Sequence, residues 1–154
     1  EKLAKQGDVR AQTSLGLMYA RGYGVDKDLN TALKWWKFAA MQNDPGAQFN
    51  LGTLFMEGVG VAQSDAEAAR WYREAAMRGH IQAQFNLGVM YFEGKGVDKD
   101  LRNAYYWLAV ASEQGDDDAK VQLKKIAAGM SQEQIQDADT KAKDWMKTAK
   151  KMWR

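Results

Sequence analysis

Residues 83–107 read AQFNLGVMYFEGKGVDKDLRNAYYW, and the chain carries this segment twice more in altered form. Residues 47–71 read AQFNLGTLFMEGVGVAQSDAEAARW, and residues 11–35 read AQTSLGLMYARGYGVDKDLNTALKW. Equivalent positions lie 36 residues apart in all three copies. A fixed period of this size is typical of repeat proteins, in which each unit buries its apolar face against its neighbours.

The first half of each copy predicts an amphipathic helix that ends at a pair of glycines. In the middle copy the apolar residues recur at helical spacing, at Ala47, Leu51, Leu54 and Phe55. Glycine at the end of a helix supplies the left-handed backbone that a side chain would strain. The three glycine pairs are Gly22/Gly24, Gly58/Gly60 and Gly94/Gly96.

The second half of each copy predicts another helix, which begins at a residue suited to cap it. The N-cap candidates are Asp28, Ser64 and Asp100. An apolar stripe then alternates alanine with large aromatic residues, so two helices can approach closely where the side chain is small. We expect Trp35, Trp71 and Trp107 to lie in the core on this stripe, and leave Trp36 unassigned.

The pattern changes after residue 115. Lys124 stands where the earlier copies have glycine, and Ser131 with Gln134 predicts the start of a final helix. Terminal repeats must present a polar outer face, so residues 116–154 are interpreted as a C-terminal cap. The final helix is rich in basic residues, namely Lys141, Lys143, Lys147, Lys150, Lys151 and Arg154.

The amino-acid composition limits which partners the chain can be expected to bind and which chemistry it can perform. Of the 154 residues 45% are hydrophobic, which is enough for a buried core, and the net charge of +2 gives no reason to expect nucleic acid or an anionic membrane. The chain has no cysteine, so disulfides, thiolate metal sites and a cysteine nucleophile are excluded. Only one proline is present, which suits a chain that is nearly all helical.

No catalytic, metal or cofactor site is predicted. His80 is the only histidine and falls in a turn where the other units have aspartate, so we interpret it as a surface turn residue. The acidic run Asp116–Asp118 precedes a helix, where carboxylates favour the positive end of the helix dipole. The Gly-x-Gly pairs follow helices and not strands, which argues against a phosphate-binding loop.

The recurring pattern A-x-x-x-L-G-x-x-Y/F-x-x-G-x-G-V-x-x-D/S-x-x-x-A-x-x-W-x-x-x-A resembles the Sel-one-like repeat (SLR) family, a relative of the tetratricopeptide repeat. The resemblance implies an all-α fold, a right-handed superhelix of antiparallel helix pairs. We expect one SLR domain over residues 1–154. Its parts are the end of a preceding repeat (1–7), three repeats (8–43, 44–79 and 80–115) and the capping helices (116–154).

The resemblance also implies a non-enzymatic adaptor that binds a protein or peptide partner in its concave groove, without a cofactor or a small-molecule substrate. In bacteria similar chains are often exported, and some neutralise secreted toxins. The alternative is therefore an exported immunity protein or inhibitor of a toxin or lipase effector. The chain begins at Glu1 without a methionine, so an export signal can have been removed. The compartment is unknown, and a periplasmic or otherwise exported location is favoured over others.

The resemblance places the first helix of each pair on the concave face, and the partner-binding residues are those of this helix that the core does not use. Apolar residues rimmed by charge suit an adaptable peptide site. The expected residues are Thr13, Leu17, Arg21, Phe49, Thr53, Met56, Glu57, Phe85, Val89, Phe92 and Glu93.

Two alternatives stay open at this point. The rings of Phe49 and Phe85 can line the groove or can pack between neighbouring helices. The final helix can be a cap, or it can dock on another subunit or a membrane surface through Trp145, Met146, Met152 and Trp153.

Overall fold

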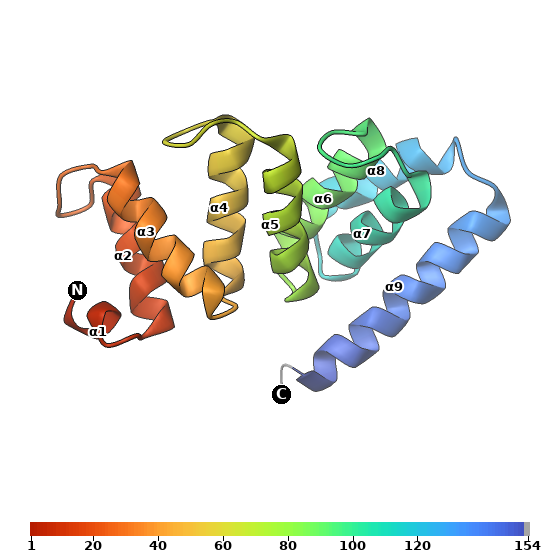
Figure 1. Ribbon diagram of the computed structural model, residues 1–154. Helices are drawn as coiled ribbons and strands as arrows, with labels where there is room; N and C mark the ends of the chain where they lie inside the picture. The colour runs from red at the N-terminus through yellow and green to blue at the C-terminus, as the bar shows by residue number, and fades with distance from the viewer. Residues whose placement is uncertain (153–154) are drawn as a thin grey trace. The chain divides into compact units, whose positions relative to one another are not determined.

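The computed structural model describes residues 1–152, without the side chains of Lys150 and Met152, and this part of the chain is helical with no strand (Figure 1). The all-α prediction is confirmed. The helices are α1 (Lys2–Lys5), α2 (Val9–Arg21), α3 (Leu29–Met41), α4 (Pro45–Glu57), α5 (Asp65–Met77), α6 (Ile81–Glu93), α7 (Leu101–Glu113), α8 (Asp117–Ala127) and α9 (Gln132–Met152).

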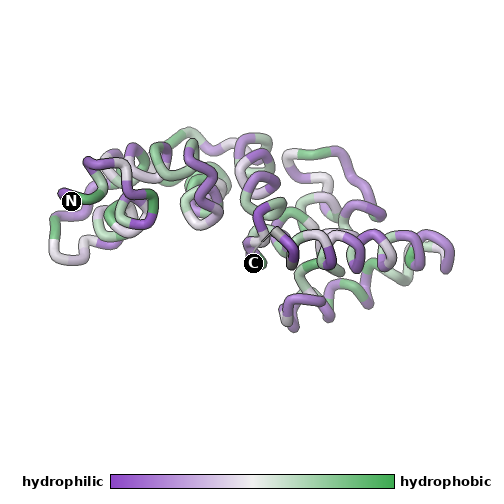
Figure 2. The backbone as a smooth tube through the Cα atoms, turned by 90° about the horizontal axis from the view of Figure 1, so that it is seen from below, coloured by the Kyte–Doolittle hydropathy of each residue, from purple (hydrophilic) through white to green (hydrophobic). Residues whose placement is uncertain are grey.

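The chain divides into two compact units, residues 1–78 with α1 to α5 and residues 79–154 with α6 to α9. Unit 1 contains the hairpins α2/α3 and α4/α5, and unit 2 contains the hairpin α6/α7 followed by α8 and α9. Polar and apolar residues alternate along each helix in Figure 2, as expected for helices with one buried face. The assignment of residues 1–154 to one domain stays a prediction.

The predicted helix ends are confirmed. The side chains of Asp28, Ser64 and Asp100 accept hydrogen bonds from backbone N–H groups in the first turns of α3, α5 and α7. The first glycine of each predicted pair ends α2, α4 or α6 in the left-handed conformation, with φ between 68° and 73°. These caps define where each hairpin turns.

Each hairpin is held by a contact between a glycine of its first helix and a large buried side chain of its second. A Cβ atom added at the glycine would lie only 2.5–2.7 Å from the partner side chain, so no other residue fits without movement. The partner side chains are 0–4% exposed. The pairs are Gly16 with Trp36, Gly52 with Tyr72, and Gly88 with Leu108.

This contact corrects the predicted core stripe. Trp107 is buried as expected, but Trp35 and Trp71 are only half-buried. The residue after each, Trp36 or Tyr72, occupies the core in their place, because that position faces the glycine of the neighbouring helix. The Nε1 of Trp36 also donates to the carbonyl of Thr13 at 3.1 Å, which satisfies its polar atom.

A buried glutamine recurs in the first helix of each hairpin, at Gln12, Gln48 and Gln84. The Nε2 atoms of Gln12 and Gln48 donate to carbonyls eight residues earlier, those of Ala4 and Ala40. The Oε1 atoms of Gln12 and Gln84 accept from Gln42 and Gln114, which follow the second helix of the same hairpin. Arg78 stands at that position in the middle hairpin, and Gln48 Oε1 has no hydrogen-bond partner in the described part of the chain.

In unit 2 the helix α9 packs along the outer side of α7. Ala138 and Ala142 are buried in one cluster with Tyr105, Ala109 and Val110 of α7. Ile135, Trp145 and Met146 are half-buried against the same cluster, so this part of the final helix docks within its own unit. The side chain of Met152 and all of Trp153, which we also considered for docking, lie outside the described residues, as do Arg154 and the side chain of Lys150.

Tyr105 is the titratable group most affected by this packing. Burial against α9 and the negative charge of Asp139, to which its hydroxyl hydrogen-bonds, together raise the pKa of Tyr105 to about 12. Burial also raises the pKa of the neighbouring Tyr106. Both hydroxyls are therefore held in the neutral form when α9 is docked.

We expect Gly52→Ala to lower the free energy of unfolding, because the new methyl group meets the ring of Tyr72. The steric cost of about 1–3 kcal/mol is offset in part by the helix propensity of alanine, worth about 1 kcal/mol. Urea denaturation followed by circular dichroism measures the difference. In a Tyr72→Ala background the same change should cost nothing or stabilise, and an equal cost in both backgrounds would contradict the contact.

We expect unit 2 to lose stability as the pH rises from about 10 to about 12. The folded state holds the proton of Tyr105 more tightly than the unfolded chain, so its contribution is complete below the unfolded pKa near 10 and is lost as the pH approaches the folded value. Tyr105→Phe should reduce this loss by up to about 2 kcal/mol. Thermal melts of the two proteins between pH 8 and pH 12 test it, and identical pH profiles would show that Tyr105 ionises freely.

Candidate functional site

A groove of about 340 Å³ opens between α2 and α4 in unit 1. Helix α2 provides one wall and α4 the other, while the turn before α3 and the turn after α4 close its end. The lining residues are Leu17, Ala20, Arg21, Lys27, Leu29, Trp36, Asn50, Thr53, Leu54, Glu57 and Val59.

The floor of the groove is apolar and fixed. Trp36 and Leu54 are buried there, and the Gly16 contact and the Trp36 hydrogen bond to Thr13 hold the indole in place. Leu17 and Val59 line the groove yet remain 41% and 37% exposed. An apolar side chain entering the groove would therefore meet a preformed surface that is still open to solvent.

The rim of the groove is charged with both signs. Arg21 and Lys27 lie on the α2 side, and Glu57 lies on α4. All three side chains are exposed, and none is part of a salt bridge within the described residues. Such a rim can pair with charged residues of a partner that flank an apolar segment. This pairing contributes more to the orientation and specificity of binding than to its affinity.

The structure brings together four of the residues predicted to bind a partner, since Leu17, Arg21, Thr53 and Glu57 all line this groove. Three others in unit 1 are half-buried and absent from its lining. The Thr13 hydroxyl donates to the carboxylate of Asp44 at 2.9 Å, and the ring of Phe49 lies 5.6 Å from that of Tyr72. The third is Met56, on the last turn of α4.

The remaining predicted residues lie on α6 in unit 2. Phe85 and Phe92 are half-buried against the core that α7 shares with α9, so their rings pack within the unit over part of their surface. Lys99 Nζ lies 5.6 Å from the centre of the Phe92 ring. Val89 is half-buried and Glu93 is exposed.

The sequence does not predict several residues of the groove. Lys27, Leu29 and Val59 belong to turns or to the start of α3, whereas the prediction took residues only from the first helix of each pair. The recurring turn pattern fixes their spacing, but it does not tell which turn residues fold back toward the helix wall. The sequence leaves the burial of Trp36 undecided, so it does not predict this indole in the floor of the groove.

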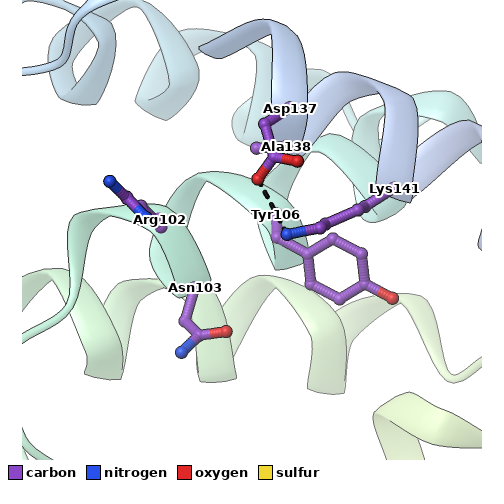
Figure 3. A pocket seen from close by; sticks show the side chains of 6 residues that line it. All are labelled: Arg102, Asn103, Tyr106, Asp137, Ala138 and Lys141. Carbon is purple, nitrogen blue, oxygen red and sulfur yellow. Dashed lines mark hydrogen bonds and ion pairs between the residues drawn. The ribbon is translucent and has the colours of Figure 1, made fainter. Parts of the chain in front are cut away.

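A second, smaller hollow of about 170 Å³ lies between α7 and α9 in unit 2 (Figure 3). Tyr106 and Asn103 face it from α7, and Asp137 and Lys141 face it from α9, where they form an ion pair of 2.7 Å. Ala138 on α9 also lines the hollow and is buried, and its small side chain lets α7 and α9 approach closely. This hollow lies along the interface between α7 and the final helix, which is called the seam below.

No group of three or more histidine, cysteine, aspartate or glutamate side chains in the described residues is arranged to hold a metal ion. None of the helices described is both long and apolar enough to span a membrane. His80 caps α6, where its Nδ1 accepts from the backbone N–H of Ala83 at 3.3 Å, which agrees with its interpretation as a turn residue.

Comparison with known proteins assigns the repeated helix pairs to a family. The family model of the Sel1 repeat matches residues 9–44, 45–80 and 81–116, which together make up more than half of the chain. The chain belongs to the Sel1 repeat family. The matched segments start one residue after the repeats expected from the sequence. Sel1 repeat proteins are generally non-catalytic modules for protein interaction.

Solved structures of Sel1 repeat proteins are similar to this one. A Sel1 repeat protein from Oxalobacter formigenes is 37% identical, with a TM-score of 0.76 over 79% of this chain and 92% of that one. A protective antigen of uropathogenic Escherichia coli with an SLR fold is 26% identical, with a TM-score of 0.72 over 94% of this chain and 39% of that longer one.

Cysteine-rich protein B of Helicobacter pylori shares the fold at 24% identity, with a TM-score of 0.64 over 79% of this chain and 93% of that one. Among curated protein sequences none matches this chain. The comparisons lend no support to the alternative of an exported immunity protein or inhibitor.

Proposed function

We propose that this Sel1 repeat protein is a non-enzymatic adaptor whose groove between α2 and α4 holds a segment of a partner protein. The observation that carries the proposal is the pairing of an apolar floor with a rim of both charges in one preformed hollow of about 340 Å³. A partner that inserts an apolar side chain over Leu17 and Leu54 would gain the hydrophobic contribution without reorganising the site.

Two further sets of predicted residues, one on α4 in unit 1 and one on α6 in unit 2, are each proposed to contact a partner. Met56 is half-buried on α4, and on α6 Phe92 and Val89 are half-buried while Glu93 is exposed. Flexible methionine and partly exposed aromatic side chains suit contact with a partner of irregular shape. In this proposal the groove supplies the anchor in unit 1, Met56 adds to it on α4, and the α6 residues form a contact of unit 2 by itself.

The proposal is tested by site-specific photo-crosslinking in cells of the natural source. A benzoylphenylalanine placed at Leu17 should capture a partner that mass spectrometry identifies. The matched control places the same group at Val121 on α8, a residue of similar exposure outside the groove. Equal capture at the two positions would contradict the groove as the binding site.

The affinity of the captured partner provides a second test. We expect Leu17→Asp to weaken binding to the purified partner by roughly a hundredfold, because a charge would replace a buried apolar contact. Arg21→Glu should weaken it by roughly tenfold through loss of charge pairing at the rim. Val121→Asp is the control, circular dichroism checks the fold, and unchanged affinity in both groove variants would overturn the proposal.

A further inference from the structure

The outer side of α3 carries an exposed apolar strip among basic residues. Phe38 is 54% exposed and Met41 is 78% exposed, and the ring of Trp35 lies edge-on to that of Phe38 at 5.9 Å. The basic residues are Lys34 and Lys37 on the same helix and Lys5 on α1. We call these six residues the α3 outer face. A hollow of about 350 Å³ lies beside the two rings and is also lined by Lys5.

The same register positions differ in the other two hairpins. On α5, Glu74 takes the place of Phe38, and ion pairs neutralise the helix, between Arg78 and Glu74 and between Arg70 and Glu67. On α7, Val110 takes that place and is fully buried. Among the described hairpins the α3 outer face alone joins exposed aromatic and methionine side chains to lysines.

The α7 helix shows how this chain covers such a face. Ala109 and Val110, which are equivalent to Lys37 and Phe38, are buried in the cluster that α7 shares with α9. The helix α9 also presents carboxylates to α7, since Asp139 accepts a hydrogen bond from Tyr105 and Asp137 lines the seam beside Arg102. The outer side of a second helix in this repeat is thus a surface on which an amphipathic helix can lie.

Charge indicates which kind of helix would lie on α3. The helix carries Lys34 and Lys37 and no acidic residue, and neither lysine forms an ion pair with any residue that the structure describes. Lys5 pairs with Glu1 at 2.7 Å, and the carboxylate of Asp28, the N-cap of α3, interacts electrostatically with Lys34 without forming an ion pair. Residues 1–43 contain seven lysine or arginine and four aspartate or glutamate residues, so this part of the chain carries a net positive charge.

We propose that the α3 outer face is a second interaction surface, which binds an acidic amphipathic helix of a partner protein. Apolar side chains of that helix would cover Phe38 and Met41, and its carboxylates would pair with Lys34 and Lys37. A second copy of this chain fits less well, because the exposed half of its own α9 toward the C-terminus is rich in lysine. The surface is separate from the groove between α2 and α4.

The probe is a fluorescein-labelled helical peptide of about 18 residues with leucine at positions i, i+3, i+4 and i+7 and glutamate on the outward side. Fluorescence anisotropy should show saturable binding that weakens as salt is added. A peptide with lysine in place of every glutamate, and a scrambled peptide, serve as controls. In two-dimensional NMR the amide signals of α3 should shift on binding, and those of α4 should not.

Variants of the chain separate this surface from the groove. Two double variants should each lower the affinity for the acidic peptide by roughly tenfold or more. They are Phe38→Ser with Met41→Ser, and Lys34→Glu with Lys37→Glu. The second pair should also strengthen binding of the lysine peptide. The matched charge reversal, Lys124→Glu with Lys125→Glu on α8, should leave binding unchanged, and so should Leu17→Asp in the groove.

Three results would overturn the proposal. The first is equal affinity for the acidic and lysine peptides, or no loss in the α3 variants. The second is self-association of the chain in sedimentation velocity that the same substitutions abolish, which would assign the face to a second copy. The third is binding to vesicles containing anionic phosphatidylglycerol through these residues without binding to the peptide, which would assign it to a membrane surface.

Discussion

The close approach of the two helices in each hairpin depends on one glycine. At Gly52 the space of a side chain is filled by the ring of Tyr72, and this contact sets both the distance and the rotation of the second helix. A helix pair packed over such a contact has little freedom to slide, because the ring fits only opposite the missing Cβ. The partner can be indole, phenol or leucine, so the constraint is on volume and position and not on chemistry.

Once the inner side of a hairpin is used for this contact, its other sides can vary. The groove side of α2 and α4 carries Leu17, Arg21 and Glu57, while the outer side of the second helix changes from apolar on α3 to ion-paired on α5. The α7 helix adds a third solution, in which the chain covers the outer side with its own α9. One scaffold thus presents different surfaces without any change in its core.

Much of the fold could be predicted, because a period of 36 residues, paired glycines and N-cap residues are local signals. The stripe that places Trp71 in the core places Tyr72 there almost as well, since adjacent helix positions differ by only 100° in direction. Gly52 on the other helix of the hairpin determines that Tyr72 is the buried residue, and this contact is known only from the tertiary structure. The groove was predicted in part for the same reason, because Lys27 and Val59 reach it from turns whose path follows no periodic pattern.

The buried glutamines have a consequence for how such a chain changes its length. Gln12 and Gln48 each reach a carbonyl eight residues earlier, at the end of the preceding helix. Removal or duplication of a block of 36 residues keeps that interval, so each amide still meets an equivalent carbonyl. A block of another length whose end falls between the glutamine and its acceptor would leave a polar group in an apolar interior without its hydrogen bond, at a cost of about 1–3 kcal/mol. Whole repeats can therefore be added or removed at these helix junctions without loss of the buried hydrogen bond.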